Sequence, residues 1–297
     1  MSRLFQNYVM IDWSAAAKKS VGADSIWIGV HRRDVRLQLR FEASNPGTRA
    51  EALETLTGIL TEFARRGDRT LVGFDFPLGF PRGTSAALKL AGDAPWAAMH
   101  AFLAKEIKDK PDNANNRFQV AAMMNRRISG GPFPFWGCPP RDAVTTLQPK
   151  KTRPHGEGDL PEHRHAEAAA KGASPVWKLY TAGSVGSQAL MGIPAVTRLK
   201  AQFPDTRIWP FETGWQALDK PSLEGVGVVV AEIYPSLFKA VPAAGEVKDL
   251  AQVRAAGEHF AALDDAGKLA AAFGPGKGTA EDVVADVAGE EGWILGV

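Results

Sequence analysis

The sequence predicts an α/β protein whose mixed sheet is flanked by helices. Apolar and polar residues alternate over residues 26–30 and 35–41, and a polar connection at 31–34 separates the two segments. A period of two is typical of a hairpin with one buried face, and residues 8–12 add a third strand before it. The chain is therefore expected to open with a three-stranded antiparallel meander.

Two short apolar runs predict buried strands for the parallel part of the sheet. Residues 70–75 lead into Phe-Pro-Leu-Gly-Phe-Pro at 76–81, whose prolines and glycine stop both a strand and a helix. Residues 227–233 repeat the design, with Glu232 near the end of the run and Tyr-Pro after it. Both runs are expected to end in rigid turns.

Helices are predicted where apolar residues recur three and four positions apart. The first covers residues 48–66, behind a helix-starting Asn-Pro-Gly-Thr sequence. The other predicted elements are helices at 85–107, 117–128, 176–203, 247–273 and 279–290, a strand near Ile208, and a long Gly- and Pro-rich loop at 130–175. We expect a single domain over residues 1–297, with a mostly helical insertion at about 84–205.

The composition excludes several classes of protein. Hydrophobic residues at 45% and charged residues at 23% argue against disorder and coiled coil. The net charge of +2 removes bulk electrostatic attraction to nucleic acid or membrane. The single cysteine, Cys138, cannot form an intramolecular disulfide, and no apolar run approaches the about 20 residues that span a bilayer. We therefore expect a cytoplasmic protein with no membrane partner.

Acidic residues stand at or near the ends of three predicted strands, namely Asp12, Asp75 and Glu232. Open α/β sheets bind ligands outside the carboxyl ends of their strands. Neighbouring strands lie about 4.8 Å apart, so carboxylates at matching heights could bridge divalent cations, and oxygen ligands favour Mg²⁺ or Mn²⁺. The alternative is that each acid marks a strand end and caps the following turn.

The last predicted helix adds Asp282 and Asp286, which lie four residues apart and so share one face. One of them is expected to point into the acidic centre, and the sequence does not decide which. A solvated acidic face, or a favourable interaction of Asp282 with the helix dipole, is the alternative.

The order of the elements, together with four short motifs, resembles the ribonuclease H-like fold. The motifs are Ile-Asp-Trp-Ser at 11–14, Gly-Phe-Asp-Phe-Pro-Leu-Gly at 73–79, Glu-Ile-Tyr-Pro at 232–235 and Glu-Asp-Val-Val-Ala-Asp at 281–286. They are similar to motifs of an uncharacterised family described as predicted ribonuclease H-like nucleases. The resemblance implies a nuclease whose carboxylates bind two metal ions, which activate water and stabilise the leaving oxygen of a phosphodiester. The implied catalytic residues are Asp12, Asp75, Glu232, Asp282 and Asp286, of which the first four would be metal ligands.

Residues expected to bind a nucleic-acid or nucleotide-like phosphate substrate lie in the same motifs and in a Gly-rich segment. Trp13 could stack a base beside a metal centre. Small residues at 182–188 permit close backbone approach and could offer amide donors to an anion, although a packing role is equally compatible with them. The expected substrate-binding residues are Trp13, Ser14, Lys18, Lys19, Pro77, Gly183, Ser184 and Ser187.

Two other classes of function stay open at this point. Asp12-Trp13-Ser14 followed by Lys18-Lys19 faintly resembles the first phosphate loop of actin-like ATPases and sugar kinases, which are phosphotransferases with a duplicated fold. This chain shows one copy. A non-catalytic binding module on the same fold is the third class, and it predicts acids that are far apart or paired with Arg.

Overall fold

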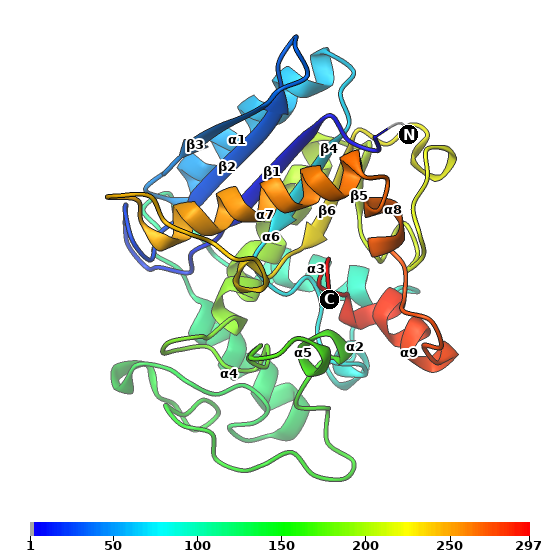
Figure 1. The fold of residues 1–297 in the computed structure, drawn as a ribbon. Helices are drawn as coiled ribbons and strands as arrows, with labels where there is room; N and C mark the ends of the chain where they lie inside the picture. Colours follow the sequence, from blue (N-terminus) through cyan, green and yellow to red (C-terminus); the bar gives the residue numbers. More distant parts are fainter. Residues whose placement is uncertain (1–2) are drawn as a thin grey trace.

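A six-stranded mixed sheet forms the centre of the computed structural model, which describes residues 3–297 (Figure 1). The strands are β1 (Asn7–Asp12), β2 (Trp27–Arg33), β3 (Leu39–Ser44), β4 (Thr70–Phe74), β5 (Thr206–Ile208) and β6 (Val228–Glu232). Their order is β3-β2-β1-β4-β6-β5, antiparallel from β3 to β1 and parallel from β1 to β5. The predicted α/β class, with a meander joined to parallel strands, is confirmed.

The described part of the chain contains nine α-helices. They are α1 (Arg49–Arg65), α2 (Thr84–Ala87), α3 (Pro95–Glu106), α4 (Arg117–Ser129), α5 (His165–Ala169), α6 (Gly186–Gln202), α7 (Lys248–Asp265), α8 (Leu269–Ala272) and α9 (Glu281–Asp286). A π-helical turn over Val287–Glu291 continues α9. Among residues 3–297, no helix has the length and apolar character needed to cross a membrane.

The two faces of the sheet are buried by different helices. Val9 and Ile11 of β1 pack in one core with α1 and α6, whereas Tyr8 and Met10 pack in a second core with α7. Figure 1 shows α7 crossing one face of the sheet and α1 and α6 lying on the other. Because successive side chains of a strand point to opposite faces, the position of a residue in its strand decides which helices it meets.

The first helix begins where the sequence predicts it. The Thr48 side chain accepts a hydrogen bond from the Glu51 amide (3.2 Å), and the Glu51 carboxylate accepts one from the Gly47 amide (2.8 Å). These contacts satisfy amide groups that have no partner within the helix.

The predicted hairpin turn is displaced. β2 continues through Arg33, and the turn covers residues 34–38, because the Asp34 carboxylate accepts hydrogen bonds from the amides of Arg36 (2.8 Å) and Gln38 (2.9 Å). Val35 is fully exposed, and the third strand starts only at Leu39. The third strand therefore starts later than the alternation over residues 35–41 predicts, although Leu39 and Phe41 are half-buried and Arg40 is exposed, as that alternation indicates.

Several predicted helices are shorter than expected because glycine or proline interrupts them. The helix predicted at 85–107 is divided into α2 and α3, with Gly92 at φ 141° and Pro95 opening α3. The helix predicted at 176–203 begins only at Gly186, and the one predicted at 247–273 is divided at Gly267. Periodicity located the helical regions but not their breaks.

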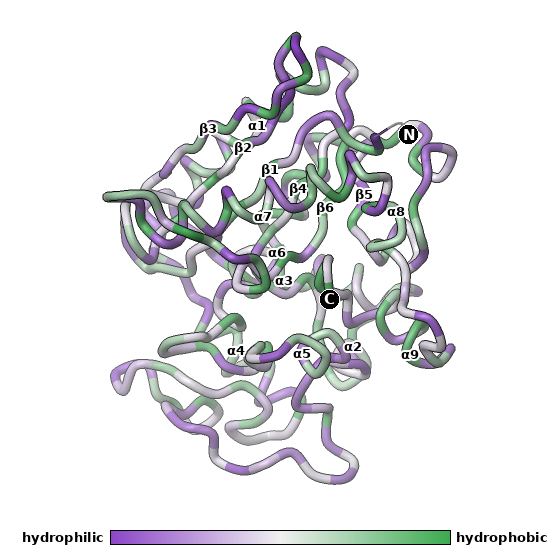
Figure 2. The backbone as a smooth tube through the Cα atoms, in the orientation of Figure 1, coloured by the Kyte–Doolittle hydropathy of each residue, from purple (hydrophilic) through white to green (hydrophobic). Residues whose placement is uncertain are grey.

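The loop predicted at 130–175 contributes to the core although it holds little regular structure. Phe133, Phe135 and Leu147 are buried there, and the main chain of Trp136 pairs with that of Lys178. Figure 2 shows hydrophilic stretches along the outer loops of this region and hydrophobic residues through the centre of the sheet.

Candidate functional site

Asp12 and Asp75 lie side by side at the carboxyl ends of β1 and β4. The ladder between these strands ends with Ile11 opposite Phe74, so the next residues, Asp12 and Asp75, are level with each other. Each follows the parity of side chains that face α7, such as Met10 and Leu71. Their carboxyl groups are close enough to share a hydrogen bond when one of them carries a proton.

Burial and mutual repulsion disfavour ionisation of this pair. Burial raises the pKa of Asp12 well above its usual value, and the negative charge of Asp75 raises it further. Burial likewise raises the pKa of Asp75 to about 6, although hydrogen bonds from Asp12 and from the Trp13 amide (2.7 Å) oppose the rise. Over residues 3–297 no Lys or Arg forms an ion pair with either carboxyl group. The Asp12–Asp75 pair is therefore two closely spaced carboxyl groups that have no basic side chain paired to them in the described part of the chain.

A third acid that the sequence analysis missed, Asp249, faces the same place. It lies in the first turn of α7, and its charge raises the pKa of both Asp12 and Asp75. Its carboxylate accepts a hydrogen bond from the amide of Asp24 (2.7 Å). The sequence signal for Asp249 was an acid in the first turn of the helix that follows the apolar run at 227–233. Only the packing of the sheet shows that this helix, α7, covers the face on which Asp12 lies.

The acids open into a groove of about 600 Å³. Besides Asp12 and Asp249, its lining includes Trp13, Ser14, Asp24, Arg117, Gly183, Ser184, Ser187 and Gln188. The structure thus brings five of the predicted substrate-binding residues, Trp13, Ser14, Gly183, Ser184 and Ser187, to one groove with Asp12. Gln188 ties α6 to the pair, since its side-chain amide donates to the Trp13 carbonyl (2.6 Å) and lies 3.5 Å from the Asp75 carboxylate.

Trp13 does not have the exposed ring that base stacking requires. Its side chain is 2% exposed and packs edge-on against Phe74 and tilted against Phe76, on the α6 side of the sheet. Its contribution to the site is the main-chain amide that donates to Asp75. The predicted stacking role does not fit this burial.

Arg117 supplies positive charge to the groove. It opens α4, and its guanidinium donates to Ser187 (2.9 Å) and Asn115 (2.8 Å). Burial lowers the pKa of Arg117 to about 10, which still leaves it protonated at neutral pH. The groove is therefore lined by the acids Asp12, Asp24 and Asp249, with Asp75 beside Asp12, and by a cation beside the start of α6.

Glu232 does not join the Asp12–Asp75 pair. The ladder sets Glu232 opposite Phe74, one residue out of step with Asp75, so its side chain points to the other face of the sheet. There it accepts two hydrogen bonds from the buried guanidinium of Arg164 (2.7 and 2.8 Å) and one from the Leu78 amide (3.2 Å). Arg164 also binds Glu167 (2.9 Å). The expected juxtaposition of Glu232 with the other strand-end acids is therefore corrected.

The remaining predicted residues contact other parts of the molecule. Asp282 is exposed on α9, while Asp286 pairs with Arg82 (2.8 Å) and His165 (3.2 Å). Lys18 is exposed, and Lys19 pairs with Glu51 (2.9 Å). Pro77 is buried in the turn after β4. The structure does not place any of these five on the groove that holds Asp12.

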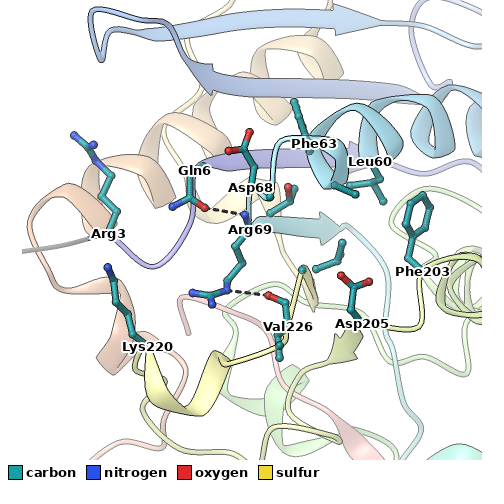
Figure 3. A pocket seen from close by; sticks show the side chains of 16 residues that line it. Arg3, Gln6, Leu60, Phe63, Asp68, Arg69, Phe203, Asp205, Lys220 and Val226 are labelled. Atoms are coloured by element: carbon teal, nitrogen blue, oxygen red, sulfur yellow. Dashed lines mark hydrogen bonds between the residues drawn. The ribbon is translucent and has the colours of Figure 1, made fainter.

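A second hollow, of about 490 Å³, lies at the opposite end of the sheet, beside Thr70 and Val228 (Figure 3). Its half-buried Arg69 donates to three main-chain carbonyls, those of Val226 (3.0 Å), Leu223 (2.7 Å) and Leu4 (3.2 Å). These bonds hold the segment before β6 against the amino end of β4, so Arg69 has a structural role.

No preformed cluster of three or more His, Cys, Asp or Glu side chains able to hold a metal ion exists within residues 3–297. The Asp12–Asp75 pair offers two carboxyl groups, and Asp249 lies on the same face of the sheet. Mg²⁺ is often bound by one or two carboxylates, water and substrate phosphate, so this donor set fits a hard divalent cation.

Comparison with known proteins finds no matching family model, and neither a curated protein nor a solved structure matches the chain significantly.

Proposed function

We propose that this protein is a metal-dependent phosphodiesterase of the ribonuclease H-like class that acts on nucleic acid or a nucleotide-like phosphate. The observation that carries the proposal is the Asp12–Asp75 pair, two half-buried carboxyl groups close together with no Lys or Arg paired to them among residues 3–297. Keeping like charges together at a sheet edge costs folding free energy, which a bound divalent cation would offset.

The sheet supports the class of fold. An antiparallel meander followed by parallel strands, with the acids on the first and fourth strands in chain order, agrees with the resemblance of the 11–14 and 73–79 motifs to predicted ribonuclease H-like nucleases. Asp249 on α7 supplies the helical acid that this class was expected to take from α9.

The residues of the chain suit phosphoester chemistry in defined ways. Asp12 and Asp75 would hold Mg²⁺ or Mn²⁺ once both are ionised, and Asp249 would act on the ion directly or through water. When bound, such an ion lowers the pKa of water and neutralises charge on a leaving oxygen. The Trp13 amide and Gln188 hold Asp75 and the end of β1 in position.

A non-catalytic binding module is the second candidate, because one observation favours it. Glu232 is paired with Arg164, as that class of function predicts. The same prediction does not describe Asp12 and Asp75, which are close together and have no Arg partner. The phosphotransferase alternative gains no such support, because Lys19 of its phosphate loop is engaged by Glu51.

The test is hydrolysis of bis(p-nitrophenyl) phosphate and of short single- and double-stranded DNA and RNA, with Mn²⁺, with Mg²⁺ and with a chelator. We expect metal-dependent hydrolysis that Asp12→Asn and Asp75→Asn reduce by at least about a hundredfold. Asp282→Asn is the matched control, since Asp282 is exposed on α9, and it should retain activity. Equal activity in Asp12→Asn and Asp282→Asn would refute the proposal.

A further inference from the structure

Arg117 is a buried cation that forms no ion pair with an acid among residues 3–297. Its residue is 9% exposed, and its hydrogen-bond partners, Ser187 and Asn115, are neutral. The ring of Phe118 lies 4.3 Å from the guanidinium carbon. A buried Arg is normally paired with a carboxylate, so an unpaired one that lines a groove indicates an anionic ligand.

Part of the guanidinium remains available to such a ligand. Nε and Nη1 donate to Ser187 and Asn115, whereas Nη2 has no hydrogen-bond partner among residues 3–297. Nη2 is also absent from the polar atoms of this region that are sealed from solvent without a partner, so it keeps some contact with solvent, and Arg117 lines the groove. Arg presents paired N–H groups in a planar fork that matches two oxygens of a phosphate.

The start of α6 fixes Arg117 in place and adds to the positive potential. The Ser187 hydroxyl donates to the Leu179 carbonyl (2.6 Å) while accepting from Arg117. A Cβ at Gly186 would lie 2.1 Å from the Val176 carbonyl oxygen, so glycine is required for this close approach. α6 is 17 residues long, and the amino end of such a helix favours anions.

Arg117 and the Asp12–Asp75 pair are separate features of the groove. The charged groups that act most strongly on Arg117 include Arg49 and Asp142 but neither Asp12 nor Asp75. Arg117 therefore does not serve as counterion to the pair, and both can bind parts of one ligand that lies along the groove.

We propose that Arg117 and the start of α6 bind a second phosphate group of the substrate, next to the phosphate that reacts at the Asp12–Asp75 pair. The substrate class is then a phosphorylated nucleotide unit, such as a strand end that carries a terminal phosphate, rather than an isolated diester. The reacting phosphate rests on the proposed function, whereas anion binding at Arg117 does not.

Calorimetry on the metal-free protein tests the subsite without turnover. The probes are inorganic phosphate, a thymidine dinucleotide with a 5′-phosphate, and the same dinucleotide without it. We expect the native protein to bind phosphate and to prefer the 5′-phosphorylated dinucleotide, and Arg117→Gln to weaken both effects by about tenfold or more. Arg126→Gln, an exposed site on the same helix, is the matched control and should bind like the native protein.

Two further variants keep the test decisive if Arg117→Gln does not fold. Arg117→Lys retains the charge without the fork, and Ser187→Ala removes the acceptor of Nε, so both should weaken phosphate binding relative to the native protein. No phosphate binding by the native protein, no preference between the dinucleotides, or equal binding by the Arg117 and Arg126 variants would overturn the subsite. Asp12→Asn should still bind phosphate, so a failure of the metal-dependent hydrolysis is distinguishable from a failure of this inference.

Discussion

Acids at the strand ends have different partners on the two faces of the sheet. On the α7 face, Asp12 and Asp75 lie next to each other and have no basic partner among residues 3–297. On the other face, Glu232 is held by Arg164 and by a main-chain amide. One residue of offset between β4 and β6 separates the two environments. The comparison separates strand-end acids that have a basic partner from those that have none, and the proposed site is built on the acids without one.

Removal of the charge of Glu232, which is paired with Arg164, should have the largest effect on stability. Glu232→Gln removes a charge partner from the fully buried Arg164 and is expected to lower the free energy of unfolding by about 3–5 kcal/mol. Urea unfolding measures the change. Glu258→Gln, whose carboxylate is half-exposed at 3.8 Å from Arg254, is the matched control and should unfold like the native protein. If the two variants were equally stable, the contrast between the faces would be lost.

The Asp12–Asp75 pair should make the free energy of unfolding fall as pH rises. The pKa of Asp75 is raised from 3.8 to about 6 in the folded state, so between these values the folded protein holds more protons than the unfolded chain. The free energy of unfolding then decreases as pH rises through this window, by roughly 1–3 kcal/mol for Asp75. Asp75→Asn should be more stable than the native protein at pH 7.5, and saturating Mn²⁺ should restore the native protein.

The pH series needs urea unfolding at pH 4.5, 6 and 7.5 with a chelator present. Asp68→Asn provides a comparison at an acid outside the groove, and its pH dependence should follow that of the native chain. Native stability that rises from pH 4.5 to 7.5 would contradict the account of the pair.

Asp249 should have a smaller effect, because it acts on the pair from α7 and has its own hydrogen bond from Asp24. Asp249→Asn is expected to weaken Mn²⁺ binding about tenfold, less than either substitution in the pair. Glu246→Gln, in the loop before α7, is a comparison outside the groove that should leave Mn²⁺ affinity unchanged. Equal Mn²⁺ affinities of the two variants would remove Asp249 from the site.

The smallest effect on Mn²⁺ affinity is expected from substitutions in α9. Asp282→Asn changes an exposed side chain and Asp286→Asn one that pairs with Arg82, so neither should alter Mn²⁺ affinity. Calorimetry with both variants checks this. A large loss of Mn²⁺ affinity in either variant would show that α9 contributes to the acidic centre, as the sequence analysis expected.

The sequence was sufficient to predict the elements that place Asp12 and Asp75 together. Apolar runs and alternation mark the strands, and the two acids directly follow β-strand positions that the ladder makes level. Glu232 carried the same local signal, but its face depends on the register between β4 and β6, which local pattern does not contain. Asp249 and Arg117 lie outside the strand ends, and only the packing of α7 and α4 brings them to the groove.

The most direct test is calorimetric titration of Mn²⁺ into the metal-free protein at pH 7.5, comparing the native chain with Asp12→Asn, Asp75→Asn and Asp282→Asn. All three variants are first shown to be folded by circular dichroism. The account predicts binding by the native chain and by Asp282→Asn, and at least about a hundredfold weaker binding by the two variants of the pair. Native-like Mn²⁺ affinity in folded Asp12→Asn and Asp75→Asn would contradict it.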